Sequence, residues 1–232
     1  MTTPRSLGPV GMWDVRELRG TAAELHALEL PEPPTASAWF LEAVAPALVL
    51  GSAEPEAHVD RRQLASAGVE LVRRRSGGGA VLVLPDACSW LDLVIPAGHD
   101  LWDADVGRAM HWVGELWCGA LADLGIGAVV HRGPMRRTDW SAHACFAGLG
   151  PGEVLDAAGR KLVGISQRRT RGAARFQTVA YHGAGPAEVV DLLAVSEDRR
   201  ESLRRELERT TAAVAAAPGA VRAALIARLA SL

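Results

Sequence analysis

The stretch Val72-Arg73-Arg74-Arg75-Ser76-Gly77-Gly78-Gly79-Ala80-Val81 is the part of the sequence from which the fold can be inferred. Three arginines lead into three glycines, and apolar residues lie on both sides. Glycine adopts positive φ and lets a ligand approach backbone N–H groups closely. Arginine binds anions through paired hydrogen bonds. The stretch therefore predicts an anion- or nucleotide-binding loop between two strands; the alternative is a tight hairpin with solvated arginines.

Short apolar runs on both sides of this loop predict closely spaced strands. They are residues 47–51, 69–72, 80–84 and 90–95, the last two ending at prolines. A helix is expected over 59–67, with Asp60 near its start and Gly68 after its end. Strands with such short links favour an antiparallel or mixed sheet over alternating strand–helix units.

Periodicity predicts the remaining elements. Helical spacing of apolar residues indicates helices over 14–30 and 103–124, whereas residues 1–12 lack a pattern and are expected to be irregular. The expected elements that follow are a strand at 128–130, paired strands at 154–156 and 161–165, a basic loop at 167–175, a strand at 176–181, and helices over 197–217 and 220–229.

Composition limits the class of protein. The 232 residues are 49% hydrophobic and carry a formal net charge of −2, which argues against non-specific nucleic-acid binding. No apolar run reaches the ~18 residues of a membrane helix, and the N-terminal residues lack the charged-then-apolar pattern of a signal peptide, so a cytoplasmic protein is expected. Three widely spaced cysteines without a CxxC predict neither a disulfide framework nor a zinc site.

Lys161 is the only lysine among 25 basic residues. A GC-rich genome explains arginine at surface positions, but a site that requires a compact ammonium cannot use arginine. Lys161 lies in the second glycine-punctuated basic segment, Gly159-Arg160-Lys161-Leu162-Val163-Gly164. An ammonium there could stabilise the charge that develops during acyl transfer. A hairpin with an exposed basic rim is the alternative.

Cys145 is a candidate nucleophile. It lies in a glycine-rich segment near His143 and several arginines, surroundings that favour a thiolate. A small buried hydrophobic role has equal weight. His182, after the last basic segment, is a further candidate for the site, although a lone histidine is more often structural. The histidines form no HExxH motif, so no metal site is predicted.

Together, these segments resemble the family of lipoate–protein ligase A and its octanoyltransferase relatives. The stretch Arg73 to Val81 resembles the family segment RRxSGGGAV, and Gly159 to Arg168 is similar to GRKxxGxAQxR. Leu48-Val49-Leu50-Gly51 resembles the strand that precedes the first segment. The resemblance covers approximately residues 10–185.

The resemblance implies an α+β fold, with a mixed, largely antiparallel sheet flanked by helices, similar to class II aminoacyl-tRNA synthetases and biotin ligases. It implies a catalytic domain over residues 1–185 and a C-terminal helical extension, 186–232, packed on the same domain. Lys161 would contact the acyl carboxyl and phosphate. The acyl or adenylate group would lie against Arg74, Arg75, Ser76, Gly77, Gly78, Gly79, Gly164, Ser166, Gln167, Arg168 and His182.

The resemblance leaves two chemistries open. Ligases of the family use ATP with Mg²⁺ to form an acyl-adenylate of lipoate or octanoate. Octanoyltransferases carry the acyl group as a thioester without ATP, and Cys145-Phe146 followed by Gly152-Glu153-Val154 is similar to their CF…YEL arrangement. The acceptor implied is a lysine of a lipoyl carrier domain, from a 2-oxoacid dehydrogenase or the glycine cleavage H protein, and an acyl carrier protein is a possible donor.

Two departures from the family pattern keep other functions open. Leu82, Val83 and Leu84 occupy the positions where the family has an aromatic residue, histidine and aspartate. The family's HG(S/T)L is represented only by His182-Gly183-Ala184 at an altered distance. A non-catalytic acyl- or nucleotide-binding paralogue, or an adenylate-forming ligase for another small carboxylic acid, is therefore an alternative.

Overall fold

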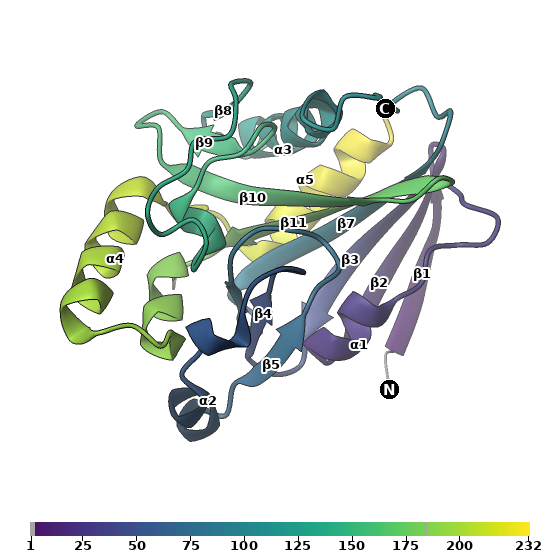
Figure 1. Cartoon of the computed structure of the whole chain (residues 1–232). Helices are drawn as coiled ribbons and strands as arrows, with labels where there is room; N and C mark the ends of the chain where they lie inside the picture. The colour runs from purple at the N-terminus through teal and green to yellow at the C-terminus, as the bar shows by residue number, and fades with distance from the viewer. Residues whose placement is uncertain (1–2, 184) are drawn as a thin grey trace.

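The computed structural model describes residues 3–183 and 185–232, which form a large eight-stranded sheet (Figure 1). Its neighbouring strands are antiparallel except β2 and β3, which are parallel. In spatial order the strands are β1 (Thr3–Val10), β2 (Trp13–Gly20), β3 (Ser37–Ala43), β7 (Cys88–Pro96), β11 (Ala173–Tyr181), β10 (Lys161–Arg169), β9 (Val154–Asp156) and β8 (Ala128–Val130).

A second sheet of three strands lies against one face of the first. Its centre is β4 (Ala47–Leu50), which is parallel to β5 (Glu70–Arg73) and antiparallel to β6 (Val81–Val83). The arginine–glycine loop connects β5 to β6. Asp60 caps α2 (Arg61–Ala67), which ends at Gly68 in the left-handed conformation. These strands, the loop and α2 match the sequence-based predictions.

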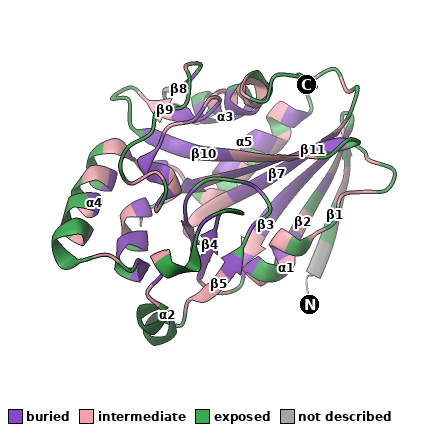
Figure 2. Ribbon diagram, viewed as in Figure 1, coloured by how far each residue is buried: buried purple, intermediate pink, exposed green. Residues whose placement is uncertain are grey.

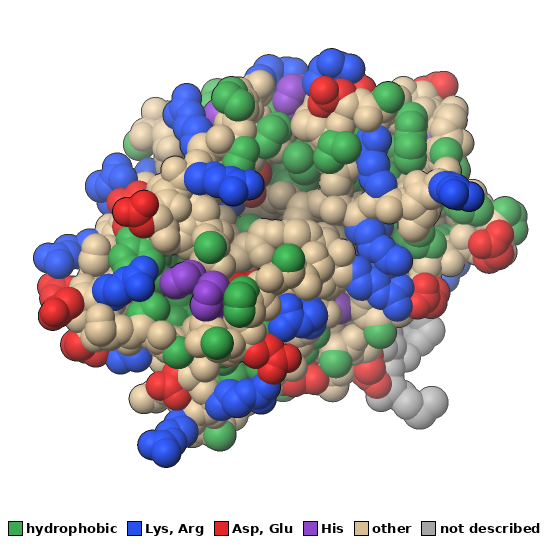
Figure 3. Space-filling model, viewed as in Figure 1, with side chains coloured by type: hydrophobic (Ala, Val, Ile, Leu, Met, Phe, Trp, Pro, Cys, Tyr) green, Lys and Arg blue, Asp and Glu red, His purple; other side chains and the backbone are tan. Residues whose placement is uncertain are grey.

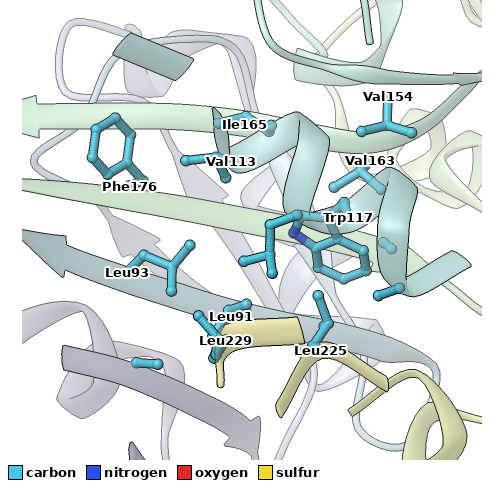
Figure 4. Packing of buried hydrophobic residues seen from close by; sticks show 14 of the residues in the cluster. Leu91, Leu93, Val113, Trp117, Val154, Val163, Ile165, Phe176, Leu225 and Leu229 are labelled. Atoms are coloured by element: carbon cyan, nitrogen blue, oxygen red, sulfur yellow. The ribbon is translucent and has the colours of Figure 1, made fainter. Parts of the chain in front are cut away.

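Helices cover the other face of the large sheet. Trp117 on α3 (His111–Asp123) packs with Leu225 and Leu229 of α5 (Pro218–Leu229) over the strands (Figure 4). The indole Nε1 of Trp117 donates to Thr178 Oγ1 at 3.1 Å, which ties α3 to β11. The central strands of the large sheet, β3, β7 and β11, are buried between the two layers (Figure 2).

Two further helices complete the layer that contains the small sheet. The short helix α1 (Ala22–Ala27) packs its buried Leu25 in the cluster formed by the two sheets. The helix α4 (Glu197–Thr210) packs Leu203 and Leu207 against the short 3₁₀ helices η3 (Cys145–Ala147) and η4 (Pro186–Leu192). None of the described helices is long and apolar enough to cross a membrane.

The predicted fold class, a mixed and largely antiparallel sheet flanked by helices, is confirmed. Beyond residue 186, α4 and α5 share hydrophobic clusters with the sheets and pack as part of the same fold. The division into a domain over 1–185 and an extension over 186–232 stays a prediction.

The predictions for the N-terminal segment were wrong. Residues 3–10 form the edge strand β1, and residues 14–30 contain β2 and the short α1 rather than one helix. The reason is that β2 is buried on both faces: Trp13 and Val15 contact the helix layer, while Leu18 contacts the small-sheet layer. Apolar residues on both faces of a strand produce a spacing that imitates a helix.

The predicted basic loop over 167–175 was also wrong, because β10 and β11 continue through it as a hairpin with only residues 170–172 between them. The cause is Arg175, which is buried and ion-paired with Asp92 at 2.6 Å. A buried arginine with a carboxylate partner can lie in the middle of a sheet. Charge alone was therefore a poor indicator of solvent exposure here.

Helix boundaries account for the remaining differences. In the predicted helix 103–124, α3 begins only at His111, after the 3₁₀ turn η2 (Arg108–Met110). Residues 211–217, expected to be helical, lie outside α4. The backbone N–H of Ala212 donates to Lys161 O at 3.0 Å, so this segment runs beside the start of β10.

Candidate active site

A narrow, mainly apolar pocket lies between the two sheets, and four of the predicted site residues line it. Two cross-strand rows of the large sheet form its floor: Gly164–Val179–Trp90 and, one row along, Ser166 beside Gln177. The remaining lining residues are His26, Val49, Arg74, Val81, Val83, Cys145, Phe146, Ile165 and Thr178. The face that carries the arginine–glycine loop is hollowed near its centre, with basic side chains around the hollow (Figure 3).

Arg74 holds the glycine loop in shape. Its buried guanidinium donates to the carbonyl oxygens of Gly77 (2.7 Å), Gly79 (2.9 Å) and Val49 (3.1 Å). Burial lowers the pKa of Arg74, and the neighbouring Cys145 and Glu54 counteract this effect. Because the guanidinium is already bound to carbonyl groups, its contribution to the site is to position the loop beside the thiol of Cys145.

The glycines are required by close backbone packing. A Cβ on Gly51 would lie 1.8 Å from Gly78 O, and one on Gly79 would lie 2.8 Å from Ser141 O. Gly78 has a φ of +101°. Within the described part of the chain, the N–H groups of Gly77, Gly78 and Gly79 donate no hydrogen bond. These N–H groups are therefore available to a carboxylate, phosphate or oxyanion.

Lys161 lies behind the pocket in a fully satisfied buried pair. Its Nζ is 2.6 Å from Glu153 Oε1 and donates to Cys145 O and Gly148 O, each at 3.1 Å. Both side chains are at most 4% exposed. Glu153 also accepts from the N–H groups of Gly150 (2.7 Å) and Ile165 (3.1 Å). The ammonium thus fixes the segment that carries Cys145 against β10.

The thiol of Cys145 faces the glycine loop. A Cβ on Gly78 would lie 3.5 Å from Cys145 Sγ and 2.8 Å from Arg74 Nη2, so the thiol and the guanidinium both border the same glycine. The backbone around Cys145 is held by hydrogen bonds to Ala80 O and Lys161 Nζ. The next residue, Phe146, places its ring over Gly164 and within 4.7 Å of Lys161 Nζ.

A directed chain of hydrogen bonds runs under the pocket. Asp92 accepts from Trp90 Nε1 (2.8 Å), Arg175 Nε (2.7 Å) and Gln177 Nε2 (3.1 Å). All its partners are donors, so Asp92 acts as the ionised acceptor; burial raises its pKa and Arg175 opposes this. The amide of Gln177 is thereby oriented with Oε1 toward Ser76, which donates to it at 2.8 Å. Because the hydroxyl proton of Ser76 is donated to Gln177, Ser166 is the donor in its 3.0 Å hydrogen bond with Ser76 Oγ.

The same chain reaches His26. Gln177 Nε2 lies 3.3 Å from His26 Nδ1, and because Nε2 of Gln177 is a donor, Nδ1 of His26 is the acceptor. Burial, with Arg175 and Arg74 nearby, lowers the pKa of His26 to about 3. His26 is therefore neutral at physiological pH and carries its proton on Nε2. Its ring lies against Trp90, with 4.6 Å between ring centroids.

The comparison with protein families matches residues 24–217 to the lipoyl protein ligase A/B catalytic domain. The chain belongs to this family. No curated protein matches its sequence.

Solved lipoate–protein ligases share the fold. The bipartite ligase of Thermoplasma acidophilum, solved in a study of that ligase and its E2 lipoyl domain, is 18% identical, with a TM-score of 0.71 over 95% of this chain and 82% of its own. A lipoate-protein ligase A bound with ATP is also 18% identical, with a TM-score of 0.69 over 96% and 85%. A T. acidophilum protein described as a lipoate protein ligase, solved with bound lipoic acid, is 16% identical. It has a TM-score of 0.69 over 96% of this chain and 86% of its own.

Not all residues predicted from the family motifs reach the pocket. Gln167 points to the opposite side of β10, where its amide donates to Val106 O. Arg75 is exposed and pairs with Glu29 at 2.8 Å. His182 is held between Ser89 Oγ and Ala216 O, each at 2.7 Å, and does not line the pocket. The predicted contribution of His182 to the acyl site is thus not supported by its position; Ala184 lies outside the described residues.

Arg168 and His143 lie near the site without lining it. Arg168 follows Ser166 on the pocket-facing side of β10. Its positive charge, like that of Arg75, lowers the pKa of Glu29. His143, two residues before Cys145, lies against His58 with tilted rings whose centroids are 4.1 Å apart, and it does not line the pocket. Desolvation lowers the pKa of His143. Both are therefore neighbours of the pocket rather than parts of its wall.

Sequence reasoning missed His26, Gln177 and the role of Glu153. Glu153 was visible within the family-like segment before Lys161, and the reciprocal need of a buried ammonium for a carboxylate could have indicated the pair. Gln177 and Trp90 come from strands whose register the sequence does not give. No sequence signal marks His26, since it lies in a segment interpreted as a long helix.

The neutral state of His26 predicts a specific pH dependence of stability. The unfolded imidazole has a pKa of 6.5 and the folded one about 3, so the unfolded state binds more protons between these values and stability is lost as pH falls through this window. Between pH 7 and pH 3, the free energy of unfolding of the wild type should fall by about 3–5 kcal/mol more than that of the His26→Phe variant. Urea titrations of both proteins across this range measure the difference; parallel pH profiles would contradict a neutral buried His26.

Proposed function

We propose that this protein transfers a medium-chain acyl group, lipoyl or octanoyl, to a lysine of a lipoyl carrier domain through a thioester on Cys145. The main support for this proposal is that the thiol of Cys145, the glycine loop with its free N–H groups and the apolar pocket adjoin one another. Membership of the lipoyl protein ligase A/B family supports this assignment. The protein is thus an enzyme of the ligase or transferase kind, and we expect it to act in the cytoplasm.

The first step is thioester exchange. The sulfur of Cys145 attacks the carbonyl carbon of an acyl donor thioester, such as an acylated carrier protein. A carbon–sulfur bond forms at Cys145 as the carbon–sulfur bond to the donor breaks, and the thiol proton leaves with the donor thiol. The N–H groups of Gly77 to Gly79 stabilise the oxygen of the tetrahedral intermediate.

The second step regenerates the thiol. The amine of the acceptor lysine attacks the Cys145 thioester, a carbon–nitrogen bond forms, and the bond to sulfur breaks. The proton lost by the amine returns to sulfur. Lys161 and Arg74 position the two sides of this reaction: Lys161 holds the carbonyl of Cys145, and Arg74 holds the glycine loop. The partner is a lipoyl carrier domain, of the 2-oxoacid dehydrogenase type or the glycine cleavage H protein.

ATP-dependent ligation is the second candidate, favoured by arginines near the pocket. The exposed Arg75 and, on the pocket side of β10, Arg168 offer guanidinium groups to an anion. Among the described residues that line the pocket, none carries a carboxylate, the ligand that Mg²⁺ prefers. In a ligase reaction ATP with Mg²⁺ would activate the acyl carboxyl, and Arg75 and Arg168 would be the residues placed to hold its phosphates.

An assay with matched donors distinguishes these functions. Purified protein is incubated with a lipoyl domain and either octanoyl carrier protein or lipoate, each with and without ATP and Mg²⁺. We expect acylation of the lipoyl domain from octanoyl carrier protein without ATP. Acylation that requires ATP and releases pyrophosphate would favour ligation. Tight binding of lipoate or octanoate with no turnover on any lipoyl domain would instead indicate a binding paralogue.

A further inference from the structure

We propose that His26 is a specificity-determining residue that donates a hydrogen bond from Nε2 to the distal part of the acyl chain. The substrate class is then a medium-chain acyl group with an oxygen or sulfur acceptor near its end, in preference to a plain hydrocarbon chain. This inference rests on the proposed function, because it assumes that the acyl group occupies the pocket beside Cys145.

The register of the large sheet places His26 at the end of the pocket opposite Cys145. Gly164, Val179 and Trp90 form one row across β10, β11 and β7. Phe146, next to Cys145, lies over Gly164 at one end of the row, and His26 lies against Trp90 at the other. Two strand spacings separate these ends, roughly 10 Å. An extended medium-length acyl chain attached at Cys145 has about the length needed to reach His26 across these two strand spacings.

The protonation state of His26 makes it a donor to the pocket. The carboxylate of Asp92 fixes the orientation of Gln177, and the amide of Gln177 occupies Nδ1 of His26. The proton is therefore on Nε2, which makes no hydrogen bond with any described residue. The low pKa of His26 agrees with a neutral imidazole.

The helix that carries His26 is held rigidly over the pocket. Arg175 donates to the carbonyl oxygens of Leu25 (3.0 Å) and Leu28 (2.9 Å), on either side of His26. The same guanidinium pairs with Asp92. Donor, helix and pocket floor are thus fixed to one another, which is the condition for a residue that selects among ligands.

The rest of the pocket explains why one donor decides the preference. Four lining side chains, those of Val49, Val81, Val83 and Val179, offer no hydrogen bond. The amide of Gln177 beside His26 is already paired with Ser76 and Asp92. Val83 occupies the position at which the resembled family has a histidine. A hydrocarbon chain that fills this end excludes water and leaves Nε2–H unpaired, which carries a penalty that an acceptor on the chain removes.

Binding of three acids to the full chain tests the proposal. The probes are octanoate, 7-oxooctanoate and lipoate, with dissociation constants measured by calorimetry at pH 7. We expect the wild type to bind 7-oxooctanoate about tenfold more tightly than octanoate, the effect of one buried hydrogen bond. Lipoate, whose sulfurs are weaker acceptors, should fall between them.

Two variants of the same position serve as a matched pair. The His26→Phe variant keeps a ring against Trp90 without the donor, and its affinity ratio should approach one. The His26→Gln variant keeps an N–H near the position of Nε2 and should retain most of the preference. Equal weakening of both acids in His26→Phe, or a wild-type ratio near one, would overturn the proposal; the wild-type ratio gives this test even where a variant does not fold.

The same experiment separates this inference from the proposed function. Selective binding without acyl transfer to a lipoyl domain would retain the role of His26 and contradict the enzymatic proposal. Acyl transfer without selective binding would retain the enzymatic proposal and contradict the role of His26. A wild-type protein that binds none of the three acids would contradict the acyl pocket and, with it, the role of His26.

Discussion

The Cys145→Ala variant is expected to lose acyl transfer to a lipoyl domain by on the order of 10³-fold or more, because Cys145 carries the only thiol among the described residues that line the pocket. The substitution should leave the fold intact. Lys161 and Ala80 contact the backbone of Cys145 rather than its side chain, and alanine retains these contacts. Initial rates from octanoyl carrier protein, with thermal unfolding as a control of folding, measure the effect.

Cys88 and Cys118 provide matched controls. Burial raises the pKa of Cys88 to about 12 and that of Cys118 to about 11, so both are poor nucleophiles. Neither lines the pocket beside the glycine loop. Their alanine variants should transfer acyl groups at near the wild-type rate. An active Cys145→Ala protein would exclude the thioester route and favour direct use of an acyl-adenylate.

The Lys161→Met variant is expected to be destabilised by about 3–5 kcal/mol and to lose transfer activity. Removing the ammonium leaves the buried carboxylate of Glu153 without its partner and frees the carbonyl groups of Cys145 and Gly148. These groups then lie in an apolar region beside Phe146. Urea unfolding monitored by fluorescence measures the loss of stability, and the transfer assay measures the loss of activity.

A double variant separates stability from chemistry. Lys161→Met combined with Glu153→Gln removes both charges, so more than half of the lost stability should return. Activity should not return, because the segment that carries Cys145 has lost its ammonium anchor. A Lys161→Met protein as stable as the wild type would show that the buried pair does not hold this segment in place.

The elements around the two glycine-containing motifs could be predicted from the sequence because local signals determine them. The loop after β5 follows from its glycines, and α2 from Asp60 and Gly68. The turn between β9 and β10 places Lys161 on a strand, as expected. The resemblance to the family then brought Cys145 and the glycine loop into one site, which spacing along the chain alone does not give.

The elements that could not be predicted depend on tertiary contacts. The strand β2 was mistaken for a helix because both of its faces are buried. The β10–β11 hairpin was mistaken for a loop because Arg175 is neutralised by a carboxylate from β7, far away in sequence. The same long-range network orients Gln177 and His26. No motif names Gln177 or His26, so the sequence offered no signal for these polar side chains.

The role of Arg74 illustrates the limit of motif reasoning. Its position in the arginine–glycine segment suggested an anion contact, and the residue does border the pocket. Its hydrogen bonds, however, go to three backbone carbonyl groups. The observed task of Arg74, holding the shape of the glycine loop, depends on contacts that only the fold creates.

In the proposed reaction, Cys145 carries the acyl group between the donor and the lipoyl domain. Intact-mass spectrometry of the wild-type protein, quenched in acid after incubation with octanoyl carrier protein and without acceptor, tests it most directly. We expect one added octanoyl group, located by peptide mapping on Cys145, removed by hydroxylamine and lost when a lipoyl domain is added. An unmodified protein that nevertheless acylates the lipoyl domain would contradict it.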